Sequence, residues 1–146
     1  MQTQPEIDWN RPDCLVSKYF TVREVTQGDE QRIPTPGSEE EINILCLAAE
    51  LDLIREAWDG PIGVTSWNRP YWVNKCVGGV SNSQHITGGA ADIYPIGSSE
   101  YEFEEWLDAR WGGALGYGAA AGRGFTHVDL RGGGFDRGTV EIRWCY

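Results

Sequence analysis

The pattern of apolar and polar positions predicts two amphipathic helices. Ser38 can cap the first helix and Gly60 with Pro61 can end it, while the second runs from Ser99 through EYEFEEWLDARW to a Gly-Gly pair. In each helix a glutamate stands three residues after the serine, which is the spacing of a reciprocal capping box. We expect the first helix to be scaffold, since its apolar residues recur at helical spacing: Leu47, Leu51, Ile54 and Trp58.

Strands are predicted mainly in the second half of the chain, at PIGVTSW, AADIYP, GFTHVDLR and TVEIRWCY. The last two are separated by GGGFDRG, a hairpin-length loop rich in turn residues, so we expect them to form a β-hairpin. RPYWVNKCVGG predicts one or two helical turns that begin near Pro70. SKYFTVREVTQ predicts a short element that packs Val22 against the core, together with Phe20 or Val25.

These elements predict the fold class α+β, with a small antiparallel sheet and helices packed mainly on one side. Helical patterns come before most of the strands, which disfavours a doubly wound parallel sheet. The length of 146 residues, the 40% hydrophobic content and the seven tryptophans fit one domain with a real core. We expect a single domain over residues 1–146, in which residues 1–16 form an irregular N-terminal arm.

Charge and composition narrow the classes of function. A formal net charge of −10 disfavours nucleic acid as a partner, because phosphate binding needs a basic surface. We expect no membrane span and no secretory signal, since no apolar run has the required length and the N-terminus lacks the signal pattern. The four cysteines lack C-x-x-C spacing, which argues against a cysteine zinc site, and a bridge between Cys14 and Cys145 stays open.

Both histidines of the chain stand in Gly-rich stretches close to an aspartate. In SNSQHITGGAADIYP, His85 precedes Asp92 by seven residues. On a helix this would be a rise of about 10.5 Å, which is too long for two ligands of one ion. The workable arrangement is a loop with His85 that runs into a strand with Asp92, and Gly88 and Gly89 would allow the backbone to bend.

The second histidine lies in FTHVDLR, where strand alternation places His127, Asp129 and Arg131 on one face. If strand 90–94 pairs with strand 125–131, Asp92 can lie across from His127, and His85 can close the triangle. Two imidazoles and a carboxylate with an open fourth position are typical of catalytic zinc. The residues alone leave other interpretations open: a hydrogen-bonded strand histidine, a turn or cap aspartate, or an iron oxygenase triad.

The motif S-x-H-x-x-G-x-A-x-D from Ser83 to Asp92, with the later F-x-H-V-D, resembles the zinc D-Ala-D-Ala carboxypeptidase family of murein peptidases. This family includes phage L-alanyl-D-glutamate endopeptidases and shares its fold with the hedgehog signalling domain. The resemblance covers about residues 17 to 132 and extends to YFTVREV, LAAELDLIREAWDGPIGVTSWNRP and LGYGAAAGRGFTHVDLRG. It implies a zinc ion held by His85, Asp92 and His127.

The resemblance also implies catalytic roles near the metal. Arg69, in S-x-x-R-P, would bind a carboxylate or carbonyl oxygen of the substrate, and the alternative is a surface or salt-bridge residue. Several relatives have an acidic residue three positions before the last histidine, where this chain has Gly124. Asp129 is then the nearest general base, and the alternative is a structural carboxylate paired with Arg131.

Three further residues are expected to contact substrate: Ser83, Trp67 and Tyr117. Ser83 opens the metal motif. Trp67 stands where relatives have the glycine of SGYR and is expected to reshape the pocket. Tyr117, in LGYG, is expected to line the site or to lie in the core.

The resemblance therefore predicts a zinc peptidase that hydrolyses D-amino-acid-containing peptide bonds of bacterial peptidoglycan, as a carboxypeptidase or an endopeptidase. Its partners would be peptidoglycan stem peptides and, for a phage endolysin or virion-associated hydrolase, components of the phage particle or of lysis. Made in the cytoplasm without a signal peptide, it would act on the wall after release or in a virion. The alternative is a catalytically inactive wall-binding or virion structural module, because Gly124 and Trp67 depart from the family pattern.

Overall fold

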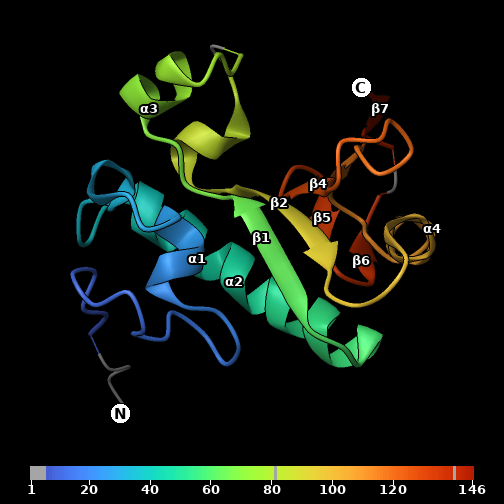
Figure 1. Ribbon diagram of the computed structural model, residues 1–146, viewed down its shortest axis with the longest axis horizontal. Coiled ribbons are helices and arrows are strands. Elements are labelled where there is room, and N and C mark those ends of the chain that lie inside the picture. The colour runs from blue at the N-terminus through green and yellow to red at the C-terminus, as the bar shows by residue number, and fades with distance from the viewer. Residues whose placement is uncertain (1–5, 81, 140) are drawn as a thin grey trace.

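The computed structural model describes residues 6–80, 82–139 and 141–146 and has the predicted α+β fold class (Figure 1). Its helical elements are α1 (Val22–Thr26), η1 (Glu30–Arg32), α2 (Glu39–Trp58), α3 (Tyr71–Cys76), η2 (Gln84–Thr87) and α4 (Glu100–Asp108). The main sheet contains β1 (Ile62–Ser66), β2 (Ala90–Pro95), β3 (Ala114–Tyr117), β4 (Thr126–Asp129) and β7 (Arg143–Cys145). A separate small sheet pairs β5 (Gly133–Gly134) with β6 (Arg137–Gly138).

The main sheet has the strand order β1-β2-β4-β3-β7. The first four strands in this order are antiparallel to their neighbours, and β7 runs parallel to β3. The predicted antiparallel sheet thus ends in one parallel pair. Both β2 and β4 are hydrogen-bonded on two sides, so they occupy the interior of the sheet.

The predicted β-hairpin between the last two strand candidates is wrong. After β4 the chain forms the small β5–β6 hairpin, in which Gly133 and Gly134 pair with Gly138 and Arg137. Glu50 of α2 accepts a hydrogen bond from the Phe135 amide at 3.0 Å and another from Arg137. This contact holds the loop against α2. The last strand, β7, then pairs with the outer edge of β3, whereas a hairpin would have paired it with β4.

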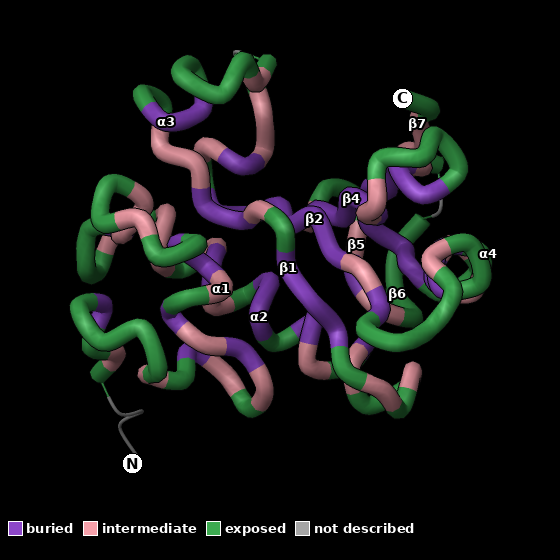
Figure 2. Tube along the Cα trace, viewed as in Figure 1, coloured by how far each residue is buried: buried purple, intermediate pink, exposed green. Residues whose placement is uncertain are grey.

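Helices α1, α2 and α4 pack against one face of the main sheet. Buried side chains of α1, α2 and α4 form a single hydrophobic cluster with Ala91, Ile93, Leu115 and Val128. Figure 2 marks the buried positions along these elements in purple. The predicted apolar stripe of α2 is confirmed at Leu47, Leu51 and Ile54, which are fully buried, while Trp58 is half-buried at the edge. Because side chains alternate along a strand, Asp92 and His127 project from the opposite face.

The N-terminus of α2 has only half of the predicted capping box. Ser38 Oγ accepts a hydrogen bond from the Glu41 amide at 3.2 Å. The Glu41 carboxylate instead accepts from the Gly37 amide at 3.1 Å and from the indole of Trp9 at 2.6 Å. The irregular segment before α1 is thereby attached to the long helix through a buried tryptophan.

Two expectations about the chain as a whole can be compared with the structure. All four cysteines are free thiols, so the possible bridge between Cys14 and Cys145 is not formed. Among the described residues, no helix combines the length and the apolar character that crossing a membrane requires.

Candidate metal centre

A row of five paired residues crosses the main sheet beneath the candidate site. Ser66 of β1 pairs with Asp92, and Asp92 pairs with His127, as the sequence predicts. On β3, Gly116 pairs with His127 on one side and with Trp144 of β7 on the other. A Cβ atom at Gly116 would lie 2.7 Å from the Trp144 indole, so the absence of a side chain there allows the indole to reach His127. The two aromatic rings lie 4.9 Å apart.

His85 stands on the η2 turn, where Trp67 holds both ends of the turn. The Trp67 carbonyl accepts a hydrogen bond from His85 Nδ1 at 2.8 Å. Its indole donates to the Gly88 carbonyl at 3.0 Å. Ser83 caps the turn through its hydroxyl, which accepts from the His85 amide at 3.2 Å. These contacts fix the position of the imidazole over β2.

Gly88 ends the turn in a left-handed conformation, with φ of +78°. A Cβ atom there would lie 2.8 Å from the Glu40 carbonyl oxygen and 2.6 Å from Ile44. We expect Gly88→Ala to lower the free energy of unfolding by about 2–4 kcal/mol, because backbone strain and overpacking add. Chemical denaturation measures this loss.

Gly89→Ala is the matched control for Gly88→Ala. The nearest atom to a Cβ at Gly89 would be Thr87 Oγ1 at 3.8 Å, which is an ordinary contact. Equal destabilisation by the two substitutions would contradict the assignment of strain to Gly88.

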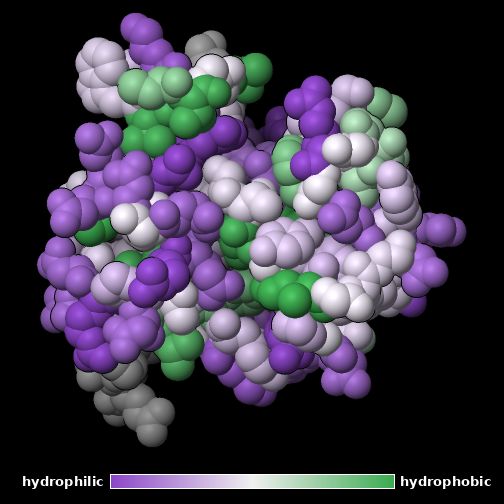
Figure 3. Space-filling model, in the orientation of Figure 1, coloured by the Kyte–Doolittle hydropathy of each residue, from purple (hydrophilic) through white to green (hydrophobic). Residues whose placement is uncertain are grey.

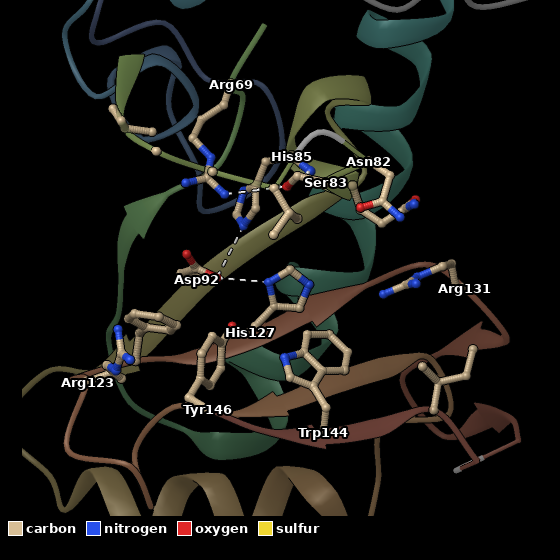
Figure 4. Close-up of a pocket in the computed structure, with 17 residues that line it drawn as sticks. Arg69, Asn82, Ser83, His85, Asp92, Arg123, His127, Arg131, Trp144 and Tyr146 are labelled. Atoms are coloured by element: carbon tan, nitrogen blue, oxygen red, sulfur yellow. Dashed lines mark hydrogen bonds and ion pairs between the residues drawn. The ribbon is translucent and has the colours of Figure 1, made fainter. Parts of the chain in front are cut away.

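Three potential ligand atoms converge above β2 and β4 (Figure 4). Asp92 Oδ1 lies 3.3 Å from His85 Nε2 and 3.0 Å from His127 Nδ1. One ligand atom from each residue lies within 4.8 Å of the others, and all three residues are buried. The structure therefore brings together the three residues that the sequence analysis selected as metal ligands.

A hydrogen bond to a carbonyl determines which nitrogen of His85 carries a proton. A carbonyl oxygen only accepts, so His85 is protonated on Nδ1 and directs the lone pair of Nε2 towards Asp92. Among the described residues, His85 Nε2 has no hydrogen-bond partner. His127 Nε2 lies 2.8 Å from Asp129 and Nδ1 lies 3.0 Å from Asp92, so each nitrogen faces a carboxylate, and a metal ion would take the place of the proton on Nδ1. The His85 lone pair aimed at a carboxylate needs a cation between them, so the donor set fits a metal ion.

Asp129 lies behind His127 and is fully buried. Its carboxylate accepts hydrogen bonds from His127 Nε2 and, at 2.9 Å each, from Nε and Nη2 of Arg131. The imidazole ring separates this carboxylate from Nδ1, where the ligand atoms converge. The sequence left two roles open for Asp129, a general base or a structural carboxylate. This geometry supports the structural role, in which Asp129 pairs with Arg131 and orients His127.

Burial and hydrogen bonding act in opposite directions on the pKa values of the cluster. Burial disfavours the charged His127 imidazole, but Asp129 and Asp92 outweigh it and raise the pKa. Burial also opposes the ionisation of Asp92, yet the neighbouring imidazoles of His127 and His85 lower the pKa of this carboxyl well below its usual range. Asp129 behaves similarly: burial is outweighed by His127 and Arg131, which lower its pKa. Both aspartates are therefore carboxylates at neutral pH.

The three residues form the floor of a cavity of about 670 Å³. Val77 and Val80, between α3 and η2, line one wall, and Trp144 and Tyr146 line another. Figure 3 shows hydrophobic side chains gathered over α3 and a hollow between this segment and the C-terminal part of the chain. The cavity thus combines an apolar rim with a polar, buried floor.

Arg69 lines the cavity beside His85. Its amide donates to the His85 carbonyl at 2.9 Å, and its Nη2 lies 3.4 Å from Ser83 Oγ. The guanidinium is half-buried, and this burial lowers the pKa of Arg69 against the opposing charge of Asp92. Among the described residues, its buried Nε atom has no hydrogen-bond partner. The side chain therefore has donor capacity left for a ligand.

The structure places two of the expected substrate contacts elsewhere. Trp67 is fully buried and packs against Phe20, with ring centroids 6.1 Å apart, so the prediction that it contacts substrate is wrong. Tyr117 donates its hydroxyl to Asp108 at 3.0 Å, on the side of the sheet towards α4. Ser83 does line the cavity, next to Arg69.

Several cavity residues escaped the sequence analysis. Arg123, Trp144 and Tyr146 all line the cavity. The alternation of Trp144 and Tyr146 in TVEIRWCY places them on one strand face, which was a usable signal. The parallel pairing of β7 with β3, which brings that face to the site, had no such signal.

The protein-family comparison supports this site. The model described as Peptidase M15 matches residues 18–129. The matched segment includes Arg69, His85, Asp92, His127 and Asp129, and it ends before β7. The comparison with curated proteins gave no match.

Proposed function

Since the chain belongs to the peptidase M15 family of zinc metallopeptidases, we propose that it hydrolyses peptide bonds next to D-amino acids in bacterial peptidoglycan. The observation that carries this proposal is the convergence of His85, Asp92 and His127 on the floor of a cavity that also holds Arg69. Two imidazoles and one carboxylate leave a fourth position open, which is the arrangement of catalytic zinc.

The proposed ligands, their hydrogen-bond partners and Arg69 have distinct roles in the reaction. When bound, zinc supplies a Lewis acid and lowers the pKa of a coordinated water towards neutrality. His85 Nε2, Asp92 and His127 Nδ1 would hold the ion. The Trp67 carbonyl and the Asp129 carboxylate keep the other nitrogen of each imidazole protonated, so both rings present lone pairs to the ligand position. Arg69 would bind and orient a carboxylate of the substrate.

Zinc affinity is expected to fall as the pH is lowered through the raised pKa of His127. Below that pKa a proton occupies the imidazole and must leave before the metal binds, whereas Asp92, with its lowered pKa, stays ionised. For each proton displaced, the affinity should drop about tenfold per pH unit. Calorimetric zinc titrations in buffers of different ionisation enthalpy measure both the affinity and the protons released. A zinc affinity that does not change between about pH 5 and pH 8 would contradict this ligand set.

Mass spectrometry of peptidoglycan fragments tests the proposed reaction. The zinc-loaded protein should either release soluble peptides from purified walls or shorten stem peptides by a terminal residue. Release of peptides identifies an endopeptidase, and shortening identifies a carboxypeptidase. Protein stripped of metal serves as the control. If neither product forms above this control, the hydrolase proposal fails.

A role as a phage endolysin or a virion-associated wall hydrolase is part of the same proposal. It is supported by the resemblance of the Ser83-to-Asp92 motif to phage endopeptidases. Lysis of bacteria by the protein added from outside, compared with lysis by the metal-free form, is the corresponding measurement.

A second candidate function is a wall-binding module without catalysis. One observation favours it: Asp92 is the only acidic residue among the described residues that line the cavity. With Gly124 in place of an acid and Asp129 behind His127, the described residues offer no second carboxylate in the cavity to move a proton. Binding of the protein to purified walls without any change in their peptides would favour this function.

A further inference from the structure

The cavity is positively charged in a protein of strongly negative charge. The whole chain has a net charge of −10, yet three arginines and one aspartate line the cavity. A metal ion on the floor would neutralise Asp92 and make this contrast stronger. A peptide with carboxylate groups is the kind of ligand that such a cavity selects.

The three arginines differ in what already occupies them. Arg131 is bound to Asp129 through two nitrogens at 2.9 Å. Arg69 and Arg123 have no ion pair with any described residue at hydrogen-bonding distance. These two guanidinium groups are therefore free to bind an anionic ligand.

Arg123 is an exposed residue that lines the cavity next to an aromatic ring. Its guanidinium lies 5.6 Å from the centre of the Tyr146 ring, and that ring packs edge-on against Phe125 at 5.5 Å. A cation–π contact with one ring does not occupy all N–H edges of a guanidinium. Those edges match a carboxylate in a bidentate geometry. The Arg123–Tyr146 pair is thus prepared to receive a carboxylate.

Arg69 and Arg123 approach the metal centre from different directions. Arg69 follows β1, whereas Arg123 lies in the turn between β3 and β4. In Figure 4 the two guanidinium groups lie on opposite sides of Asp92. Arg123 lies within the residues that the family comparison matches, whereas Tyr146, which follows β7, lies outside them.

We propose that Arg123, supported by Tyr146, forms a second carboxylate subsite, and that the substrates are peptides with a carboxylate on each side of the scissile bond. This inference rests on the proposed function, since it takes Arg69 as the first subsite. It narrows the substrate class to dianionic peptides among the stem peptides of the wall.

Binding of uncleavable peptides to the zinc-loaded protein tests the second subsite. The probes are a tetrapeptide whose central amide nitrogen is methylated, with a free carboxylate on each side, and its two singly amidated forms. By calorimetry, Arg123→Gln should weaken binding of the dianionic peptide about tenfold, which is the effect of one charge-assisted contact. One of the two amidated peptides lacks the carboxylate that Arg123 would bind. The affinity for this peptide should be the same in Arg123→Gln as in the parent protein.

Arg110→Gln is the matched control, because Arg110 also stacks on an aromatic ring, Trp106, at 4.8 Å but lies outside the cavity. Unchanged binding in Arg123→Gln, or equal losses for all three peptides, would overturn the subsite. Wall digestion is measured separately with the parent protein. If peptide affinity depends on Arg123 but the walls are not digested, the subsite stands and the proposed function is refuted. If the walls are digested but peptide affinity does not depend on Arg123, the proposed function stands and the subsite is refuted.

Discussion

His85→Ala is expected to abolish zinc binding and peptidase activity together. The substitution removes one of three proposed ligands, and changes to residues that only support a ligand already cost about ten- to a hundredfold in metal affinity. We therefore expect a loss of about a thousandfold or more in zinc affinity. The fold should persist with a loss of about 1–3 kcal/mol, because the buried carbonyl of Trp67 loses its hydrogen-bond donor.

Metal content after dialysis and far-UV circular dichroism measure the two effects of His85→Ala separately. Thr87→Ala is a suitable control, since Thr87 lies in the same turn and its hydroxyl only donates to the Gln84 carbonyl at 3.1 Å. Zinc binding by His85→Ala at the affinity of the parent protein would refute the proposed metal centre.

Asp129→Asn is expected to weaken zinc binding about ten- to a hundredfold, which is the usual effect of removing the carboxylate that orients a histidine ligand. The amide cannot stabilise the imidazole proton as the carboxylate does, and Arg131 loses its ionic partner. The pKa of His127 should fall at the same time, because Asp129 is one of the two groups that raise it. Zinc titration and NMR titration of the imidazole measure these changes.

The same substitution distinguishes the two roles considered for Asp129. A general base would leave zinc affinity unchanged and lower kcat with a shifted pH profile, whereas a positioning residue changes the affinity first. Asp52→Asn is the control, since Asp52 accepts hydrogen bonds from Ser17 and from the Lys18 and Tyr19 amides away from the cavity. An unaltered zinc affinity in Asp129→Asn would contradict the positioning role.

Local patterns predicted the parts of the fold that depend on neighbouring residues. The cap at Ser38, the stripe of α2 and the strand AADIYP are all present, because helical and strand periodicities are visible within a single segment. The position of the last strand was not predictable in this way. A hairpin-length loop favours antiparallel pairing, but contacts of Glu50, more than eighty residues away in the chain, hold this loop on α2.

Local patterns likewise predicted some features of the candidate site and not others. The register that places Asp92 opposite His127 followed from two strand patterns and the need to bring one carboxylate to a histidine. The role of Asp129 did not follow, because a strand pattern shows that residues share a face but not which nitrogen of an imidazole faces which carboxylate. Trp67 was misplaced because its departure from the SGYR motif does not show which way the side chain points, and its indole and carbonyl both hold the η2 turn.

The location of β2 and β4 inside the sheet has a consequence for how this scaffold can diversify. Two of the three proposed ligands stand on these doubly bonded strands, while the arginines and aromatic side chains above them come from turns and from the outermost strand. Substitutions in these turns and in the outermost strand can accumulate with little effect on the spacing of the ligands. A lineage of such proteins could thereby acquire new preferences among peptides while its reaction stays the same.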